Sequence, residues 1–427
     1  MRSTAWFRPL LLLALHTLVV GASGQDSKPA AESRWAIPVS DAGLPGAGPI
    51  RRYEWFRKLW SERRAKWASE VERDQGAVVF LGDSITQGWG DVPGGDAFAG
   101  MKAVNRGISG DTTRGVLVRL DEDVLSVKPA AVVLLIGTND LEEKAEPETI
   151  AGNLKLILDR LKAHNPRMPV VLCDVFPSSA SKARPAEKIR KVNELYAGLV
   201  RGDAQVTRVE TWTLFADPNG DAKPEEFPDL LHPNRLGYAK WAAAIRPILA
   251  TLGFLEKEPD GFQPEEGFVS LFNGRDLSGW GYRTNVFDGL TASPDGRYVA
   301  RNGRLVVTTP PEGRRFQILW TRQEFPRDFV LRLEFRATPN ADSGIFIRKP
   351  QLQCRDYLLA GPYKSLMKYR PQDWNEVEVT VKGGTAYATC NGEVLEAAMT
   401  VPETGPIGLE GDRGQMEYRR IRVREMR

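Results

Sequence analysis

The sequence predicts two domains: an α/β domain built on a parallel sheet with helices on both faces, and a C-terminal all-β sandwich. Short apolar runs without alternation recur between helical stretches in the first half of the chain, as in strands covered on both faces. Beyond residue 266 the hydrophobic period changes to two, as in half-buried antiparallel strands. The 427 residues also exceed what one hydrophobic core usually organises.

The α/β domain is expected over residues 50–254. Its strand candidates are the apolar runs 77–81, 102–105, 131–136, 170–174 and 206–210. The clearest helical stretches are 148–163, 186–200 and 237–252.

Aromatic side chains at helical spacing among charged residues predict an amphipathic helix over residues 51–73. These are Tyr53, Phe56, Trp60 and Trp67. We favour packing of this face against the following domain. The alternative is an aromatic, basic face that binds membranes or polysaccharides.

The N-terminus has the pattern of a secretory signal peptide, because Arg2 and Arg8 precede the apolar run 10–20 and small residues follow it. No later stretch approaches the ~20 apolar residues of a spanning helix. We therefore expect cleavage of residues 1–24, a secreted or periplasmic protein and no transmembrane segment. Residues 25–49, rich in Pro, Gly, Ala and Ser, are expected to form a flexible lead-in.

A charged segment with proline, residues 255–266, is the expected linker to the second domain, residues 267–427. Within that domain apolar and polar residues alternate, for example over 331–336 and 376–381. Pairs such as Asn391-Gly392 supply the two-residue turns of tight hairpins.

Charge and cysteine content exclude several classes of partner. The formal charge of +3 becomes +3 − 2 = +1 once Arg2 and Arg8 leave with the signal, so neither nucleic acid nor an anionic membrane is implied. The three cysteines match no zinc-site spacing, and no metal or other cofactor is expected. Cys173 is expected to be buried in an apolar run. A disulfide between Cys354 and Cys390 stays open.

Polar clusters follow the first three predicted strands: GDSIT (82–86), NRGISGDTT (105–113) and GTND (137–140). A fourth, DLLHP (229–233), precedes the last helix. Open α/β sheets bind their ligands at the carboxyl ends of the strands, so these clusters are expected to converge.

A serine hydroxyl becomes a nucleophile only when a base takes its proton, and histidine suits that task near neutral pH. His16 leaves with the signal, and His164 stands at a helix C-terminus, where imidazoles commonly cap carbonyls. His232 is therefore the candidate base for Ser84. Asp229, three residues earlier, is close enough to bind the far ring nitrogen and fix the tautomer.

Ester hydrolysis also needs donors for the developing oxyanion. The candidates are the backbone N–H of Ser84, that of Gly107 and the side-chain amide of Asn139. Each of the last two has another interpretation, since Gly107 fits a turn and Asn139 fits a helix cap.

The four blocks occur in the order of the signature blocks of SGNH hydrolases, also called GDSL esterases, which the chain resembles over about residues 76–253. The resemblance implies a flavodoxin-like three-layer α/β sandwich. It implies a catalytic triad of Ser84, Asp229 and His232, an oxyanion hole of Ser84, Gly107 and Asn139, and a supporting role for Asp83. GDSITQGWG and NRGISGDTT resemble most the branch with platelet-activating-factor acetylhydrolase-like and carbohydrate acetylesterase enzymes.

Residues 267–427 resemble the 3-keto-disaccharide hydrolase domain, a concanavalin-like jelly roll, through SLFNGRDLSGW, DSGIFIR and GPIGLEGDRGQMEYRRIRV. Many relatives carry a histidine after GPIGL, where this sequence has Gly-Asp-Arg at 411–413. The resemblance implies a carbohydrate partner. Candidate sugar contacts are Asp342, Arg348, Gln353 and Trp374; Asp342 also fits a turn and Trp374 a core position.

The sequence therefore predicts an exported serine esterase that removes acyl groups, acetyl first among them, from carbohydrate esters or acylated glycans. Three alternatives stay open. The first is that the main activity is that of a 3-keto-glycoside hydrolase or lyase in the second domain. The second is that the chain is a carbohydrate-binding surface protein, and the third is that the substrate is a lipid ester, as for a lysophospholipase or platelet-activating-factor acetylhydrolase.

Overall fold

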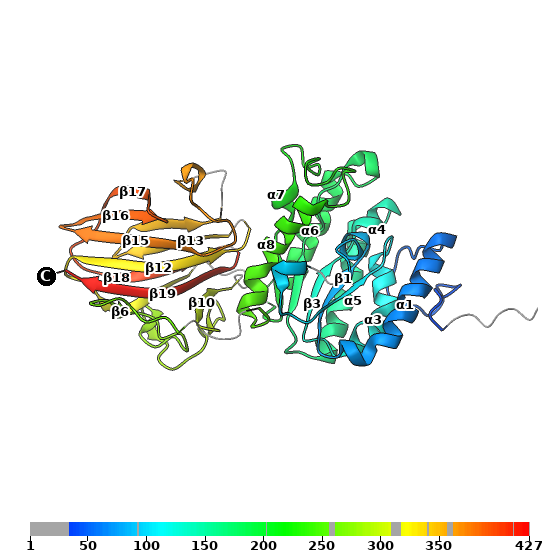
Figure 1. Ribbon diagram of the computed structural model, residues 1–427, viewed down its shortest axis with the longest axis horizontal. Coiled ribbons are helices and arrows are strands. Elements are labelled where there is room, and N and C mark those ends of the chain that lie inside the picture. Colours follow the sequence, from blue (N-terminus) through cyan, green and yellow to red (C-terminus); the bar gives the residue numbers. More distant parts are fainter. Residues whose placement is uncertain are drawn as a thin grey trace, which may run out of the picture.

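The computed structural model describes residues 34–91, 94–201, 203–255, 261–308, 317–339, 341–356, 362–412 and 414–426. An α/β domain and a β-sandwich lie side by side along the long axis of the molecule (Figure 1). The expected signal peptide, residues 1–24, lies outside the described residues. So does part of the expected linker, residues 256–260.

The α/β domain is built on a five-stranded parallel sheet with strand order β2-β1-β3-β4-β5, the flavodoxin-like order. Each strand overlaps one of the predicted apolar runs. Three of them, β1, β3 and β4, are buried along their whole length, which explains why their sequences do not alternate. The strands are β1 (Val78–Gly82), β2 (Ala103–Gly107), β3 (Ala131–Leu135), β4 (Val170–Cys173) and β5 (Val206–Val209).

Helices cover both faces of this sheet. Alternate strand residues such as Val79 and Leu81 pack with α3, α5 and α6 on one face. Val78 and Phe80 pack with α8 on the other. The long helices are α1 (Glu54–Asp74), α3 (Thr113–Asp123), α5 (Pro147–His164), α6 (Ala186–Val200) and α8 (Arg235–Thr251). Short ones are α2 (Ser84–Gln87), α4 (Thr138–Glu142), α7 (Trp212–Phe215) and the 3-10 turns η1 (Gly95–Phe98), η2 (Leu125–Val127) and η3 (Ala180–Lys182).

Helix α1 confirms the helix predicted over residues 51–73. Phe56, Trp60 and Trp67 are buried, so this part of the aromatic face packs against the domain as we favoured. Tyr53, which precedes the helix, and Trp55 in its first turn are both about half exposed, with relative exposures of 53 % and 52 %.

The lead-in expected to be flexible is instead packed against the domain over residues 34–49. The side chain of Asn153 on α5 accepts from the N–H of Ala47 (3.0 Å) and donates to its carbonyl (2.8 Å). Arg114 on α3 pairs with Asp41 (2.7 Å) and donates to the carbonyl of Gly48 (2.8 Å). Composition indicated flexibility, but these polar side chains supply partners for the backbone of the segment.

The second domain is the predicted antiparallel sandwich of two sheets, consistent with a jelly roll. The larger sheet has the order β17-β16-β15-β12-β19-β10-β9, with β6 also paired to β19, and the smaller has the order β14-β13-β18-β11-β7-β8. Apolar residues of the alternating strands, among them Leu331, Leu333 and Phe335, form one core between the sheets. Cys354 and Cys390 are buried there as free thiols, and Cys173 is buried in the α/β domain.

The elements of this domain are β6 (Val269–Ser270), β7 (Trp280–Tyr282), β8 (Asn285–Val286), β9 (Tyr298–Arg301), β10 (Arg304–Val307), β11 (Gln317–Glu324), β12 (Phe329–Ala337), β13 (Asp342–Ile347), β14 (Gln351–Arg355), η4 (Pro362–Ser365), β15 (Asn375–Lys382), β16 (Thr385–Cys390), β17 (Glu393–Thr400), β18 (Pro406–Gly411) and β19 (Met416–Glu425).

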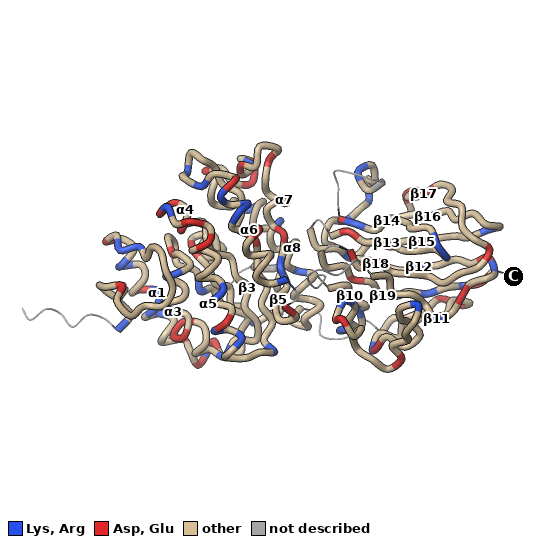
Figure 2. Tube along the Cα trace, turned by 180° about the vertical axis from the view of Figure 1, so that it is seen from behind, with Lys and Arg blue, Asp and Glu red and all other residues tan. Residues whose placement is uncertain are grey.

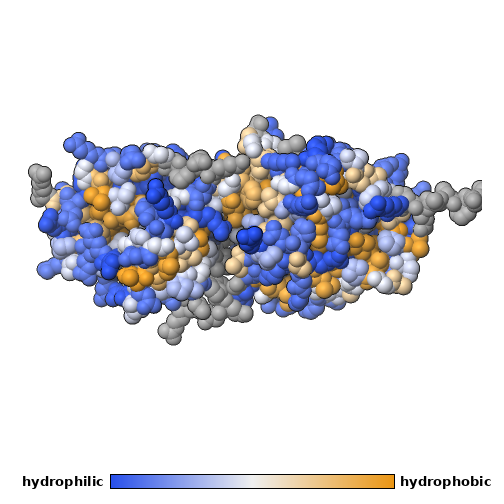
Figure 3. All heavy atoms as spheres, turned by 90° about the horizontal axis from the view of Figure 1, so that it is seen from below, coloured by the Kyte–Doolittle hydropathy of each residue, from blue (hydrophilic) through white to orange (hydrophobic). Residues whose placement is uncertain are grey.

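Acidic and basic residues are interspersed over both domains (Figure 2). The face in Figure 3 likewise mixes hydrophilic residues with smaller apolar areas. Among the described residues, no helix combines the length and apolarity needed to cross a bilayer.

The C-terminal end of α8 meets the larger sheet of the sandwich. The Asn302 side chain donates to the carbonyl of Ala250 (3.0 Å), and the Thr251 hydroxyl donates to the Glu417 carboxylate. Glu417, whose side chain is 1 % exposed, also accepts from Arg336 at 2.9 and 2.7 Å. A buried ion pair therefore lies where the two domains touch.

We predict that Glu417→Gln lowers the free energy of unfolding by about 3–5 kcal/mol, because it removes the carboxylate charge that pairs with the buried Arg336 guanidinium. Urea denaturation of the full chain measures the change. The control is Glu403→Gln, at an exposed glutamate, for which we expect less than about 0.5 kcal/mol. Similar losses in the free energy of unfolding for the two variants would contradict a stabilising role of the buried Arg336–Glu417 ion pair.

Candidate active site

Ser84 stands at the junction of β1 and α2, at the carboxyl edge of the parallel sheet. Asp83 caps α2, its Oδ1 accepting from the N–H of Ile85 (2.9 Å). The turn is tight: a Cβ on Gly82 would lie 2.3 Å from the carbonyl oxygen of Leu135, which only glycine avoids. This junction fixes the direction in which the Ser84 hydroxyl points.

Ser84, His232 and Asp229 form one hydrogen-bonded chain. Nε2 of His232 lies 2.9 Å from Oγ of Ser84, and its Nδ1 lies 2.7 Å from Oδ2 of Asp229. The structure thus brings together the three residues that the sequence selected. With Nδ1–H donating to the carboxylate, the lone pair of Nε2 faces the serine hydroxyl.

The Asp229 carboxylate is held in its ionised form. Burial pushes its pKa upward, but the backbone and side chain of His232 and the N–H of Leu231 donate to it, and together they lower the pKa below 3.8. The two backbone bonds are 2.7 and 3.0 Å long. A permanent negative charge at this position stabilises the imidazolium that forms when His232 takes a proton.

Two contacts that the sequence did not reveal fix the region around His232, one to the serine turn and one to the loop after β4. The Tyr238 hydroxyl, on α8, donates to the carbonyl of Ile85 (2.8 Å), which ties α8 to α2. The Ser178 hydroxyl donates to the carbonyl of Leu230 (2.7 Å), within the turn that carries Asp229. Tyr238 and Ser178 are distant in the sequence from the residues that they contact, so no local motif predicted these two hydrogen bonds.

Gly107 does not lie as the sequence predicted for an oxyanion donor. It is the last residue of β2, and its N–H donates to Oδ1 of Asn105 (2.8 Å). Gly110, three residues later, has φ +86° and an N–H without an acceptor among the described residues. The N–H of Ser84 likewise has none in the described part of the chain. The available donor of this loop is therefore Gly110.

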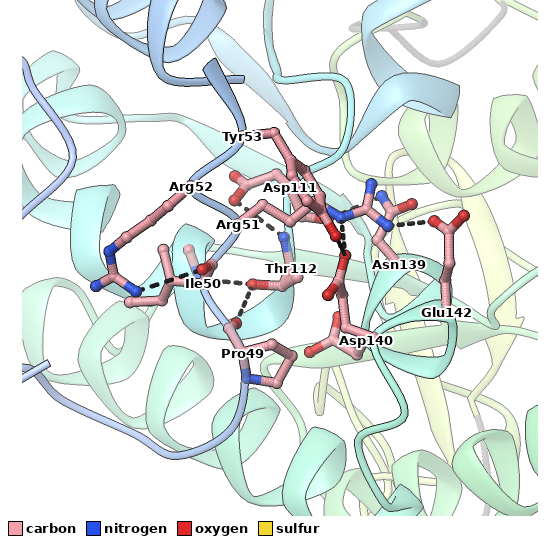
Figure 4. A network of polar contacts seen from close by, with 12 residues as sticks. Pro49, Ile50, Arg51, Arg52, Tyr53, Asp111, Thr112, Asn139, Asp140 and Glu142 are labelled. Atoms are coloured by element: carbon pink, nitrogen blue, oxygen red, sulfur yellow. Dashed lines mark hydrogen bonds and ion pairs between the residues drawn. The ribbon is translucent and has the colours of Figure 1, made fainter. Parts of the chain in front are cut away.

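Asn139 lies at the start of α4, almost fully buried, with one amide hydrogen donating to the carbonyl of Asp111 (2.9 Å) (Figure 4). Its Oδ1 accepts from Nη2 of Arg184 (3.0 Å). Arg184 also pairs with Glu142 (2.7 Å) and donates to the carbonyl of Thr138 (3.1 Å). These bonds fix the amide and leave its second hydrogen for a ligand. Sequence analysis missed Arg184 because it lies in a loop without a motif.

In the second domain, Asp342 and Gln353 lie on adjacent strands of the smaller sheet, β13 and β14. Arg355 joins them, pairing with Asp342 (3.2 Å) and donating to Gln353. Gln353 also donates to Gln351, and Gln351 donates to Glu410 on β18, which sequence analysis did not select. We call these connected side chains, from Asp342 to Glu410, the polar row. Burial, followed by the charges of Asp412 and Asp342, raises the pKa of Glu410 to about 7.

Arg348 and Trp374 do not join this polar row. The guanidinium of Arg348 is occupied by the carbonyls of Pro402 (2.7 Å) and Arg327 (2.8 Å). Trp374 precedes β15 of the other sheet and lies under the guanidinium of Arg419, 3.9 Å from its ring centroid. Both side chains are thus engaged in contacts within the sandwich.

Models of two protein families match the two domains of the chain. The model of the GDSL-like Lipase/Acylhydrolase family matches residues 80–240, and that of the 3-keto-alpha-glucoside-1,2-lyase-like domain matches residues 267–424. Platelet-activating factor acetylhydrolase IB subunit alpha1 of Pongo abelii is 30 % identical over 200 residues, 45 % of this chain and 84 % of the relative. The chain belongs to the GDSL-like lipase/acylhydrolase family.

Two further similarities cover the same domain. The alpha2 subunit of Homo sapiens is 28 % identical over 208 residues, 47 % of this chain and 87 % of that protein. A solved GDSL-like lipase from Bacteroides thetaiotaomicron VPI-5482 is 27 % identical with a TM-score of 0.39, covering 45 % of this chain and 96 % of the other. As a member of the GDSL-like acylhydrolases, the protein is a carboxylic ester hydrolase.

Three buried carboxyl groups surround the catalytic loops of this GDSL-like hydrolase. Burial is the largest influence on each and raises the pKa of Asp83 to about 6, that of Asp111 to about 6 and that of Asp140 to about 7. Asp111 pairs with Arg119 (2.8 Å), and Asp140 accepts from the backbone and hydroxyl of Thr113. Oδ2 of Asp83 has no partner among the described residues.

The raised pKa of Asp83 predicts a pH-dependent stability. Between about pH 4 and 6 the folded chain keeps this proton while the unfolded chain loses it, so the free energy of unfolding falls as pH rises. Asp83→Asn cannot ionise and keeps a side chain that caps helices. The free energy of unfolding of Asp83→Asn minus that of the parent protein should therefore rise by roughly 3 kcal/mol between about pH 4 and pH 6.

Urea denaturation at a series of pH values tests this expectation. The control is Asp159→Asn, at an exposed aspartate on α5, measured against the parent at the same pH values. A constant difference between Asp83→Asn and the parent would show that the folded chain does not retain the proton.

Proposed function

We propose that the protein is an exported serine esterase that removes acyl groups, above all acetyl groups, from carbohydrate esters. The observation that carries the proposal is the hydrogen-bonded chain from Ser84 through His232 to Asp229. The named activity of the acetylhydrolase relatives supports a small acyl group. The second domain, similar to a domain named for a glucoside lyase, supports a carbohydrate as the alcohol part. The pattern of residues 1–24 supports export.

In the proposed reaction, Oγ of Ser84 attacks the ester carbonyl while Nε2 of His232 takes its proton. The carbonyl oxygen becomes negative and is stabilised by the N–H groups of Ser84 and Gly110 and the second amide hydrogen of Asn139. The C–O bond to the alcohol then breaks, and the imidazolium gives its proton to the departing oxygen. Water, activated by the same imidazole, releases the acyl group as the acid.

Ser84→Ala should lower the turnover of an acetyl ester by roughly 10⁴-fold or more, because the acyl-enzyme can no longer form. The assay panel is p-nitrophenyl acetate, acetylated xylo-oligosaccharides and an acetyl-ester phospholipid. The control is Ser69→Ala, at an exposed serine on α1. Full activity in Ser84→Ala would reject the triad. If the parent protein hydrolyses the phospholipid but not the acetylated oligosaccharides, the substrate would be a lipid ester instead of a carbohydrate ester.

A second candidate function is cleavage of 3-keto-glycosides by the C-terminal domain. The specific observation is Glu410, whose raised pKa of about 7 keeps a share of the carboxyl protonated near neutral pH. Such a group can donate a proton to a departing glycosidic oxygen. It lies in a polar row with Gln351 and near Asp342, where a sugar could be held.

Glu410→Gln should then lower the cleavage of a 3-keto-disaccharide by roughly 10²-fold or more. Activity of the parent protein should fall as pH rises above about 7, because the carboxyl loses the proton that it donates. The assay uses the Ser84→Ala protein, so that ester hydrolysis does not contribute, with Glu403→Gln as control. Unchanged cleavage in Glu410→Gln, or none in the parent, would reject this candidate.

A further inference from the structure

We infer that Trp55 and Tyr53, with the charged side chains beside them, form a subsite that binds a sugar ring of the substrate next to the oxyanion loops. The inference deepens the proposed carbohydrate esterase function and rests on it. It also gives a role to the two aromatic residues at the beginning of α1 that are about half exposed.

Trp55 and Tyr53 differ from the other aromatic residues of this segment. Phe56, Trp60 and Trp67 are buried, whereas Trp55 and Tyr53 are 52 % and 53 % exposed. Their two rings are inclined by only 13°, with centroids 6.3 Å apart. Two large aromatic faces therefore lie nearly parallel in contact with solvent. Such faces suit the apolar C–H surface of a sugar ring, as they suit other flat ligands.

An open cavity of about 600 Å³ lies at these rings, lined by Arg51, Tyr53, Trp55, Glu142, Glu143 and Lys144. Its size falls in the range of small-molecule sites. Donors and acceptors are fixed in the wall, since Arg51 pairs with Glu143 (2.7 Å) and with Glu142 (Figure 4). The Tyr53 hydroxyl also reaches Glu143, at 3.3 Å. A polar wall beside aromatic faces fits a hydroxyl-rich ring.

The cavity is joined to the reaction centre on two sides. A Cβ on Gly110 would lie 2.7 Å from Cη2 of Trp55 and 3.1 Å from Nη1 of Arg51, so both side chains lie against the residue with the available oxyanion donor. On the other side, Glu142 accepts from Arg184, which also holds Oδ1 of Asn139 (3.0 Å). A ring in the cavity thus adjoins the loops that surround the ester.

The wall chemistry distinguishes a sugar from other occupants. An extended acyl chain would have to displace water from Arg51, Glu142 and Glu143 without replacing their hydrogen bonds, which is costly. An anionic membrane needs a basic cluster, but here two glutamates accompany Arg51 and Lys144. A neutral polyhydroxyl ring satisfies both the charged groups and the aromatic faces.

The test compares selectivity between a large and a small ester. For each variant, kcat/KM is measured with acetylated xylo-oligosaccharides and with p-nitrophenyl acetate, and their ratio is taken. In Trp55→Ala the ratio should fall about ten-fold, mainly through KM of the oligosaccharide, with a smaller fall in Tyr53→Ala. Trp55→Phe, which keeps an aromatic face, should recover most of it. Tyr387→Ala, at an exposed tyrosine of β16, is the control.

Binding is measured separately in the Ser84→Ala protein by calorimetric titration with the same oligosaccharides. Adding Trp55→Ala should raise the Kd for the oligosaccharides about ten-fold. An unchanged ratio and Kd in Trp55→Ala, or an equal fall in Tyr387→Ala, would overturn the subsite while hydrolysis of the glycan still supports the proposed function. If the protein hydrolyses p-nitrophenyl acetate but none of the acetylated glycans, both the subsite and the proposed carbohydrate esterase function would be overturned. Trp55-dependent binding to phospholipid vesicles, without binding to the oligosaccharides, would assign the site to a lipid.

Discussion

The hydrogen bond between Oγ of Ser84 and Nε2 of His232 joins residues 148 positions apart in the chain, and the architecture of the α/β domain serves to make it short. Parallel strands end at one edge, so the loops after β1, β2 and β3 meet there. Helix α8 begins directly after the turn that carries His232, and the bond from Tyr238 to Ile85 fixes its distance from the serine turn. The hydroxyl and the imidazole are thereby positioned before any substrate arrives, which lowers the reorganisation that the reaction requires.

Around this bond, the catalytic loops are held by charged side chains rather than by apolar packing alone. Arg184 bonds Asn139 and Glu142, Glu142 bonds Arg51, and Arg51 belongs to the segment that leads into α1. The N-terminal segment is therefore connected to Asn139 by two ion pairs and one hydrogen bond in sequence. The family model matches residues 80–240, so Arg51 lies outside the residues that it matches.

In the described part of the chain, the two domains touch at the end of α8, where Thr251 donates to the desolvated Arg336–Glu417 ion pair of the sandwich. Glu417 binds both Arg336 of its own sheet and Thr251 of α8. Because a buried charge is costly without its partner, this contact favours one arrangement of the domains. The polar row from Asp342 to Glu410 lies on the other sheet of the sandwich. Each domain thus has its own candidate site, and the residues of the domain contact belong to neither.

The sequence by itself determined the fold class of both domains and selected Ser84, His232 and Asp229 as the candidate triad, because hydrophobic period and the block D-x-x-H are local properties of the chain. Asp229 and His232 are close in any turn of that length, and the serine turn follows directly from a buried strand. Tertiary structure decided what depends on direction and on distant partners. The bond of Asn105 occupies the N–H of Gly107 and leaves that of Gly110 available, a matter of backbone torsion that glycine content does not reveal. Arg184, Tyr238 and Glu410 acquire their places only when separate segments pack together, and the half-exposed Trp55 is distinguished from the buried Trp60 only by the surface against which the helix lies.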